Sequence, residues 1–474
     1  MKQELVRFVR SYVKEIENGT AAVFAGAGLS LPAGFVNWKE LLRPIAEGID
    51  LNVDRENDLV TLAQFHLNAH RNNRNELTQT VINEFGKKAR ETENHEILAR
   101  LPIRTYWTTN YDKLLETSLE RASRIPDVKF TVEHLAQTKP NRNAVVYKMH
   151  GDISLPHNVI LTRDDYESYH VKFQPFITAL SGDLVDKTFM FIGFSFTDPN
   201  LEYVLSRIRT TFANNQRKHY CFLKSVEQGE HESEEDFEYR KRRHALVIAD
   251  LLNYNIHTLE IDDYSEVTEV LRTIEGAYRR RTVFVSGSAH EYGDWGTEKA
   301  EEFLGKIGKK LIESQFKVVT GMGLGVGNSV IAGALDQIYM HQKEILHDQI
   351  IMRPFPQGVN VRELWESYRQ DMTSYAGISI FVFGNKLENG QVVEANGVVR
   401  EFEIARDKGH ALIPIGATGY VAESLWGKIQ NDFQAYFPDY PEGLKTKFSA
   451  LGDKSLDEDA LLVSLVKVLK ELEK

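Results

Sequence analysis

Short apolar runs alternate with segments of helical period along most of the chain. The first segment carries an apolar stripe of helical spacing, formed by Leu5, Phe8, Val9, Tyr12, Val13 and Ile16. A buried strand that leads into a glycine loop is predicted at 21–30, and further strand-like runs follow at 105–109, 143–150, 157–162, 187–194, 219–224 and 255–261. This alternation predicts a parallel sheet covered by helices on both faces.

A second series of the same kind begins after three consecutive arginines. Strands that end in glycine loops are predicted at 282–289 and 317–330, further strands at 349–356, 378–385 and 411–420, and an amphipathic helix over the last twenty residues. We therefore predict an α/β protein with two doubly wound, Rossmann-like parallel-sheet domains in tandem, residues 1–281 and 282–474. The charge run at 225–244 is predicted to be a solvated helix face.

Composition narrows the classes of function. The 474 residues are 42% hydrophobic and 26% charged, which excludes wholesale disorder, and the net charge of −11 argues against nucleic acid as a partner. The lone cysteine, Cys221, excludes an intrachain disulfide and a four-cysteine zinc site. Because the first residues are charged and no apolar run approaches the ~20 residues that span a bilayer, we expect a cytoplasmic protein without a membrane partner.

Four polar or glycine-rich segments follow predicted strands of the first domain. Ligands of open α/β sheets bind outside the carboxyl ends of the strands, so these segments are candidates for one crevice. The glycine loop FAGAGLS (24–30) lets a backbone approach a pyrophosphate, although a plain strand-to-helix turn explains it equally well. Taken singly, His150 would be a structural hydrogen-bond partner and Asn110 a turn residue. The other three segments contribute Asn110 and Asp112, His150, and Gly193 with Ser195 and Asp198.

These segments resemble the sirtuin family over about residues 15–260. Gly26-Ala27-Gly28-Leu29-Ser30 is similar to its dinucleotide loop, Thr109-Asn110-Tyr111-Asp112 to its strand end with Thr109 in place of glutamine, His150-Gly151 to its catalytic pair, and Gly193 and Ser195 to its glycine–serine loop. The resemblance implies that Asn110 holds the nicotinamide-ribose hydroxyls or a water. It also implies that His150 is the base that takes a proton from a ribose hydroxyl or from water.

One departure from that family is informative. Protein-deacylating sirtuins generally carry a small domain clamped by zinc on four cysteines, and this chain has one cysteine. The departure argues against peptide deacylation. It favours water as the acceptor, which corresponds to hydrolysis of NAD+ to ADP-ribose and nicotinamide, with NAD+ as a substrate, no cofactor and no zinc.

The second domain carries two glycine loops and scattered charges. Gly287, Ser288, Gly323 and Gly325 are expected to approach phosphates with their backbone N–H groups. Arg369 and Lys386 suit phosphates and Glu401 suits ribose hydroxyls, although each alone is equally well a surface charge. The loops resemble the lysine-decarboxylase-like phosphoribohydrolases and their sensor branch, the SLOG domains. Because stretch 395–403 keeps one glycine of the hydrolase loop, the resemblance implies nucleotide binding without hydrolysis in this domain.

The order of the two domains resembles the NADase effectors of the Thoeris antiphage defence system. The segments that carry this resemblance are FAGAGLS, TYWTTNYD, VVYKMHGD, FIGFSFTDPNL, TGMGLGVG and RPFPQG. It implies that a TIR-domain partner enzyme makes a cyclic ADP-ribose isomer, which binds the C-terminal domain and switches on NAD+ destruction. It also implies a homotetramer with higher-order assembly on activation. Two other readings stay open: a sirtuin-like deacylase with a nucleotide sensor, and a non-catalytic nucleotide-binding protein.

Overall fold

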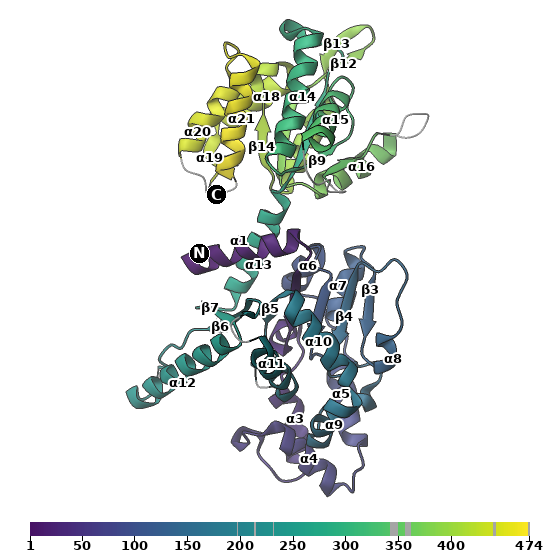
Figure 1. Ribbon diagram of the computed structural model, residues 1–474, viewed down its shortest axis with the longest axis vertical. Helices are drawn as coiled ribbons and strands as arrows, with labels where there is room; N and C mark the ends of the chain where they lie inside the picture. The colour runs from purple at the N-terminus through teal and green to yellow at the C-terminus, as the bar shows by residue number, and fades with distance from the viewer. Residues whose placement is uncertain are drawn as a thin grey trace. The chain divides into compact units, whose positions relative to one another are not determined.

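The computed structural model describes residues 1–196, 198–212, 215–230, 232–341, 349–355, 362–438 and 442–472. The chain forms two compact units, Met1–Glu275 (unit 1) and Gly276–Lys474 (unit 2), drawn in Figure 1. The predicted boundary after Arg281 lies a few residues further along, where the first strand of unit 2 begins. Each unit is an α/β fold built on its own parallel sheet, so the predicted fold class is confirmed.

Unit 1 is built on a seven-stranded parallel sheet with the order β3-β4-β2-β1-β5-β6-β7. All residues of β1, β2 and β5 are buried, which requires cover on both faces. The strands are β1 Ala21–Ala25, β2 Thr105–Thr108, β3 Pro126–Lys129, β4 Ala144–Lys148, β5 Thr188–Ile192, β6 His219–Lys224 and β7 Ile256–Ile261. The helices are α1 Gln3–Glu17, α2 Ala27–Ser30, α3 Trp38–Glu47, α4 Leu59–Ala69, α5 Asn75–Phe85, α6 Glu93–Arg100, α7 Leu114–Arg121, α8 Val132–Leu135, α9 Arg163–Lys172, α10 Gln174–Asp186, α11 Pro199–Phe212, α12 Glu234–Asn253 and α13 Ser265–Arg279, which continues into unit 2.

The register of the central strands brings four chain segments to one edge of the sheet. Ala25 at the end of β1 is opposite Thr108 of β2 and Ile192 of β5, and Thr108 is opposite Lys148 of β4. The segments that follow these strands therefore emerge side by side. The chain order reverses between β1 and β5, and this switch point is where open α/β sheets bind their ligands.

A buried ammonium group ties together two of these segments. Lys148 Nζ donates to the backbone carbonyls of Tyr111 and Asp112, which follow β2, and to the carboxylates of Glu116 and Asp152. Burial alone would lower the pKa of Lys148, but the three carboxyl groups of Glu116, Asp152 and Asp112 raise it above its usual value. The lysine therefore stays charged and fastens the loop after β2 to the loop after β4.

Unit 2 has a five-stranded parallel sheet with the order β10-β9-β8-β11-β14 and an antiparallel hairpin, β12-β13. Its strands are β8 Thr282–Ser288, β9 Lys317–Thr320, β10 Ile350–Met352, β11 Ile378–Phe383, β12 Asn385–Glu388, β13 Gln391–Glu394 and β14 Ala411–Pro414. Its helices are α14 Thr297–Glu313, α15 Gly327–Asp336, α16 Arg362–Ser374, α17 Asn396–Asp407, α18 Tyr420–Asn431, α19 Phe433–Tyr436, α20 Glu442–Ser449 and α21 Glu458–Leu472.

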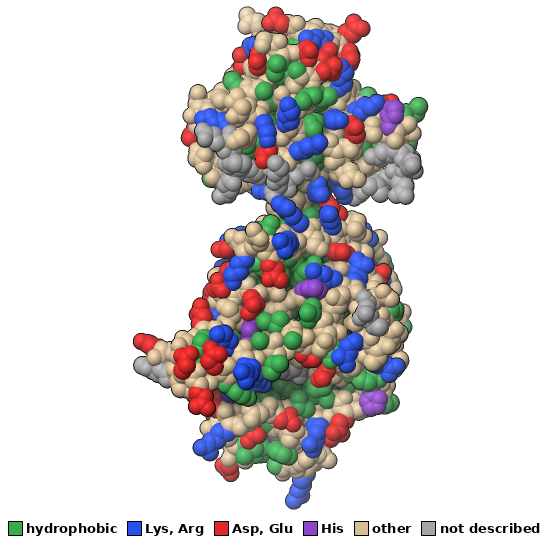
Figure 2. Space-filling model, turned by 60° about the vertical axis from the view of Figure 1, so that its left-hand side comes forward, with side chains coloured by type: hydrophobic (Ala, Val, Ile, Leu, Met, Phe, Trp, Pro, Cys, Tyr) green, Lys and Arg blue, Asp and Glu red, His purple; other side chains and the backbone are tan. Residues whose placement is uncertain are grey.

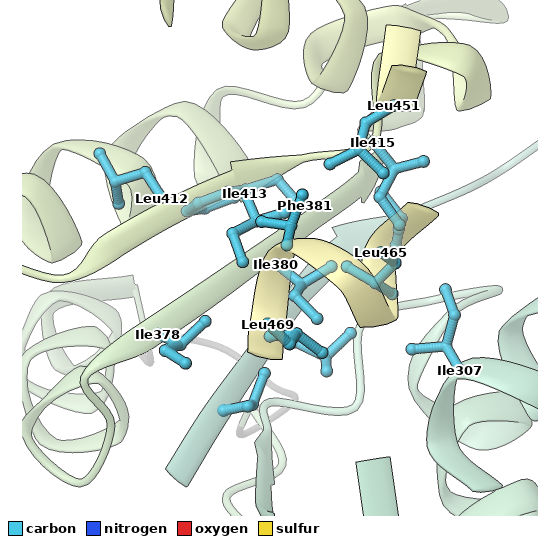
Figure 3. Packing of buried hydrophobic residues seen from close by; sticks show 14 of the residues in the cluster. Ile307, Ile378, Ile380, Phe381, Leu412, Ile413, Ile415, Leu451, Leu465 and Leu469 are labelled. Carbon is cyan, nitrogen blue, oxygen red and sulfur yellow. The ribbon is translucent and has the colours of Figure 1, made fainter. Parts of the chain in front are cut away.

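The main core of unit 2 lies between its central strands and its last helix. Figure 3 shows Ile380 of β11 next to Leu465 and Leu469 of α21, and Ile307 of α14 belongs to the same cluster. A smaller cluster consists of Phe284, Val319, Met372 and Ala376. Met372 lies in the last turn of α16, and Ala376 follows that helix. The sheet is therefore covered on both faces, as the apolar strands predict.

Most of the elements predicted from the pattern are present, one predicted strand is wrong, and three observed strands were not predicted. The N-terminal stripe is confirmed, since all six of its residues are buried in α1, and the charge run continues into α12, of which Leu251 is the buried residue. The predicted strand at 157–162 is wrong. Pro156 begins a 3-10 turn there, and Thr162 caps α9, so the apolar residues between them pack without joining the sheet. Edge strand β3 and the hairpin strands β12 and β13 were not predicted, because their sequences PDVK, NKLE and QVVE lack apolar runs of strand length.

Two surface properties follow from the described residues. None of their helices combines the length and the apolar character needed to cross a bilayer. On the visible face of unit 1, acidic and basic side chains are interspersed (Figure 2). This mixing gives that face no continuous basic surface of the kind that follows a phosphate backbone.

We predict that Lys148→Met destabilises unit 1 by about 3–5 kcal/mol, because the substitution leaves buried carboxylates without their counter-charge. Chemical denaturation measures this change in the free energy of unfolding, and hydrogen exchange of the β2 and β4 amides locates it in the sheet. Lys14→Met, at an exposed position of α1, is the control and is expected to stay within about 0.5 kcal/mol of wild type. A Lys148→Met protein as stable as this control would contradict the role of the buried ammonium.

We also predict that His219 makes unit 1 less stable in mild acid. Its Nδ1 accepts from the Phe189 backbone N–H at 3.1 Å, and burial lowers its pKa to about 3. This pKa lies below the value of about 6.5 in the unfolded chain, so the unfolded chain binds more protons between these two pH values. The contribution of His219 to the free energy of unfolding is therefore fully present above about pH 6.5 and declines toward pH 3. Between pH 7 and pH 5, the free energy of unfolding of wild type should fall by about 2 kcal/mol more than that of His219→Gln. Hydrogen exchange of the β5 and β6 amides measures this difference. The exposed His157→Gln should keep the wild-type pH dependence.

Candidate functional site

The glycines of the first loop bring two strand ends into backbone contact. Gly26 N donates to Ile192 O and Gly28 N donates to Gly193 O, both at 2.9 Å. Gly193 has a φ of +64°, and a Cβ there would lie 2.3 Å from Leu29 N. The structure therefore accounts for these glycines by the close approach of two loops at the switch point, before any ligand is considered.

Asn110 is fastened to the same loop. Its side-chain Nδ2 donates to Gly26 O at 3.0 Å and to Ser30 Oγ at 3.1 Å, and its backbone N–H donates to Thr108 Oγ1. Ser30 is buried at the end of α2, while Ala27 and Gly28 are half-buried. The structure thus brings together Asn110 and the predicted dinucleotide loop, which come from strands β2 and β1.

His150 is paired with a carboxylate from the neighbouring loop. Its Nε2 lies 3.0 Å from Asp198 Oδ2, off the line of a well-formed hydrogen bond, and its side chain is 2% exposed. Burial alone would raise the pKa of Asp198, but His150 and the backbone N–H groups of Leu201 and Asn200 hold it below its usual value. The Asp198 carboxylate is therefore charged where it faces the imidazole.

Aromatic rings enclose this pair. The His150 ring meets Tyr166 edge-to-face at 5.5 Å and Tyr169 at 6.4 Å, and Tyr166 in turn contacts Trp38. Tyr169 donates its hydroxyl hydrogen to Met149 O, and Tyr166 Oη lies 3.5 Å from Asp198 Oδ2. Sequence reasoning missed these two tyrosines, because they lie on α9, away from the strand ends. Their spacing of three residues on a polar helix is the signal that could have found them.

The other predicted residues of unit 1 take different places. Asp112 accepts from Leu114 N at 2.9 Å with Oδ1, so its carboxylate lies at the start of α7 and belongs to the buried charge cluster around Lys148. Its other oxygen is buried without a hydrogen-bond partner. Ser195 is exposed in the segment between β5 and α11. Asp198, predicted as a nucleotide contact, is the partner of His150.

In unit 2 the two predicted glycine loops also pack on each other. A Cβ at Gly323 would lie 2.0 Å from Gly287 O, and one at Gly325 would lie 2.3 Å from Ala289 O. Ser288 Oγ donates to Asn385 O at 3.0 Å, which joins the end of β8 to the hairpin. The loops after β8 and β9 therefore lie beside the end of β11 at the carboxyl edge of the second sheet.

Arg369 and Glu401 lie together in unit 2. Arg369 Nε is 3.4 Å from Glu401 Oε1, without the geometry of a hydrogen bond, and Glu401 Oε2 accepts from Ser286 Oγ at 2.6 Å. The guanidinium also stacks over Phe355 and Trp365, at 5.2 and 5.8 Å from the ring centroids. Burial raises the pKa of Glu401, although Ser286 and Arg369 oppose that shift. Ser286 was missed, although it lies in the predicted strand at 282–289, next to Gly287.

Lys386 has a separate place on the hairpin. Its Nζ lies 3.2 Å from Glu388 Oε2 on the same strand, and its side chain is half-exposed. The preceding residue, Asn385, is fully buried and was missed by the sequence analysis. Asn385 Oδ1 accepts from the backbone N–H groups of His290 and Glu291, and its Nδ2 donates to Glu291 O. The last three residues of RPFPQG, 356–358, lie outside the described residues.

Two family models match the chain, one in each half. Residues 104–247 match the SIR2-like domain, and residues 266–472 match the Sir2- and TIR-associating SLOG family. The first match covers the strands that carry Asn110, His150 and Gly193. The second covers nearly all of unit 2, including the Arg369–Glu401 pair.

Curated relatives match over almost their whole length. "NAD(+) hydrolase ThsA" of Bacillus cereus (strain MSX-D12) is 49% identical over 465 residues, 98% of both chains. The protein of the same name from Acinetobacter baumannii (strain 532279) is 48% identical and covers 96% of both chains. That of Cytobacillus dafuensis is 42% identical over 98% of this chain and 96% of its own. Since both units and their order are shared at this identity, the chain belongs to the ThsA family of NAD(+) hydrolases.

Proposed function

We propose that unit 1 hydrolyses NAD+ to ADP-ribose and nicotinamide and that a cyclic ADP-ribose isomer bound to unit 2 switches this reaction on. The observation that carries the proposal is the His150–Asp198 pair at the sheet edge that also holds Asn110. The names of the full-length relatives support the reaction. The match of unit 2 to a Sir2- and TIR-associating family supports a TIR-domain enzyme as the source of the activator.

The chemistry assigns separate tasks to the residues of unit 1. Breaking the bond between the ribose C1′ and nicotinamide leaves an oxocarbenium-like sugar, which water attacks. Nε2 of His150 faces the Asp198 carboxylate, which only accepts, so we assign the imidazole proton to Nε2 and a lone pair to Nδ1. Nδ1 is buried without a hydrogen-bond partner, and we assign to it the proton taken from water or from a ribose hydroxyl. Asn110 orients the ribose or the attacking water.

The burial of His150 supports control of this reaction by a change of conformation. A side chain that is 2% exposed and enclosed by Tyr166 and Tyr169 gives NAD+ no direct approach. A ligand changes such an equilibrium only if it binds the open and closed states unequally. We propose that the activator favours the open state and that active chains form a homotetramer with higher-order assembly, which depletes NAD+ in antiphage defence of the Thoeris type.

The Arg369–Glu401 pair supports a site for an anionic nucleotide in unit 2. The Arg369 Nε makes no hydrogen bond, so a phosphate can engage the guanidinium without displacing one from that nitrogen. We assign the activator's phosphates to Arg369, to Lys386 and to the backbone N–H groups of the loops that carry Gly287, Ser288, Gly323 and Gly325. Glu401 remains the candidate partner for ribose hydroxyls.

The experiment that tests the whole proposal uses the purified full-length chain. NAD+ is incubated with the protein, with and without cyclic ADP-ribose isomers, and nicotinamide and ADP-ribose are measured by chromatography. A parallel sample contains an acetylated peptide, so that O-acetyl-ADP-ribose would reveal a deacylase. Release of both products only with a cyclic isomer is expected. Nucleotide binding without any product would instead identify a non-catalytic protein.

We predict that His150→Ala and Asn110→Ala each reduce NAD+ loss at saturating activator by at least about 10²-fold, because both residues act in one transition state. His157→Ala, an exposed histidine of the neighbouring turn, should keep the wild-type rate. Circular dichroism confirms that the variants are folded. Turnover by the His150 variant within a few-fold of wild type would refute the base assignment.

We predict that Arg369→Ala raises the activator concentration needed for half-maximal activity about ten- to a hundredfold, since a charge-assisted hydrogen bond contributes roughly 1.5–3 kcal/mol. Calorimetry should show binding weakened by the same factor. Arg406→Ala, an exposed arginine paired with Asp407, is the matched control. Unchanged binding in the Arg369 variant would remove this residue from the site.

A further inference from the structure

Two histidines and a glutamate converge at the junction of α4 and α5, outside the sheet edge that holds Asn110 and His150. His66 and His70 are one turn apart at the end of α4, and Glu76 lies in the first turn of α5. One ligand atom from each residue can be chosen so that all three lie within 4.8 Å of one another. His66 Nε2 is 2.9 Å from Glu76 Oε2, His70 Nε2 is 3.7 Å from the same oxygen, and the two rings stack at 4.1 Å.

The hydrogen bonds of His70 determine which of its nitrogens is free. Its Nδ1 lies 2.9 Å from the backbone carbonyl of His66, and a carbonyl only accepts, so Nδ1 carries the proton. In the neutral ring, Nε2 then keeps a lone pair near the Glu76 carboxylate. A backbone carbonyl that holds one ring nitrogen of a histidine while the other faces outward is the arrangement that orients metal-binding imidazoles.

His66 supplies a second imidazole, and its side chain is 1% exposed. A direct hydrogen bond between His66 Nε2 and Glu76 leaves the buried His66 Nδ1 without a partner, and it leaves the His70 lone pair opposite a carboxylate. A cation between the three atoms would remove that repulsion. His70 and Glu76 are 35% and 64% exposed, so an ion and a bound water can enter from solvent.

We propose that His66, His70 and Glu76 form a binding site for a divalent transition-metal ion of the Zn²⁺ type. Two imidazoles and one carboxylate are a ligand set that suits zinc, with water in the fourth tetrahedral position. The ion would fasten the end of α4 to the start of α5. These helices belong to a cluster that packs against Tyr111, Val159 and Leu161, so the ion would stiffen the helical layer beside the loop that carries Asn110.

This site differs from the four-cysteine clamp of protein-deacylating sirtuins, which the single cysteine excludes. It uses neither the residues nor the position assigned to NAD+. The proposal therefore stands or falls independently of the proposed hydrolase activity.

The test uses the full-length chain without an affinity tag, after dialysis against a chelator. Co²⁺, which substitutes for zinc and absorbs visible light when tetrahedrally bound, is titrated into the protein, and Zn²⁺ binding is measured by calorimetry. One ion per chain is expected, with a visible Co²⁺ spectrum that Zn²⁺ removes. His70→Gln and Glu76→Gln change exposed ligands, so both variants should remain folded, and each should weaken Zn²⁺ binding by at least about tenfold.

His170→Gln, an exposed histidine of α9, is the matched control and should bind like wild type. Thermal unfolding gives a second measurement, because a ligand that binds the folded state raises Tm. At one Zn²⁺ concentration, the Tm of wild type and of the control should therefore rise by more than that of Glu76→Gln. Absence of stoichiometric binding, or equal binding by wild type and the two ligand variants, would overturn the proposal.

Discussion

The candidate active site depends on one buried ammonium group. Lys148 is the last residue of β4, and its Nζ contacts two backbone carbonyls after β2 and two carboxylates. Asn110 and His150 lie within two residues of these contacts. A buried charge must keep all its partners, because leaving any of them unpaired costs several kcal/mol. The relative position of the two predicted catalytic side chains is therefore determined beneath the site, by a residue that makes no contact with the proposed substrate.

Unit 2 joins its strand ends by neutral hydrogen bonds instead. The buried side chain of Asn385 accepts from the backbone N–H groups of His290 and Glu291 and donates to the Glu291 carbonyl. Neutral hydrogen bonds contribute about 0.5–1.5 kcal/mol each, so such a junction rearranges more readily than one held by a buried ion pair. The loops after β2 and β4 in unit 1 are therefore held more firmly to each other than the loop after β8 is held to the hairpin in unit 2.

The sequence predicts the fold well because both sheets are parallel and their central strands are buried on both faces, so these strands are continuous apolar runs. It also identifies the strand-end residues, since β1, β2, β4 and β5 end in register. The pairing of His150 with Asp198 could not be predicted, because it depends on how the segment after β5 turns toward β4. The position of Tyr166 depends on the packing of α9. The prediction of a strand at 157–162 was wrong because Pro156 begins a 3-10 turn and Thr162 caps α9, which leaves too few residues between them for a strand.

The glycines show how far a motif alone can be interpreted. A glycine-rich loop after a strand suggests a phosphate, yet Gly26, Gly193 and Gly323 are each required by backbone contacts within the chain. A loop shaped by such contacts can still present its N–H groups to a ligand, but the glycines do not determine which ligand that is. The choice of ligand must come from side chains that are held in place while one of their polar atoms has no hydrogen-bond partner within the chain. His150 with its unpartnered Nδ1 and Arg369 with its unpartnered Nε are side chains of this kind, one in each unit.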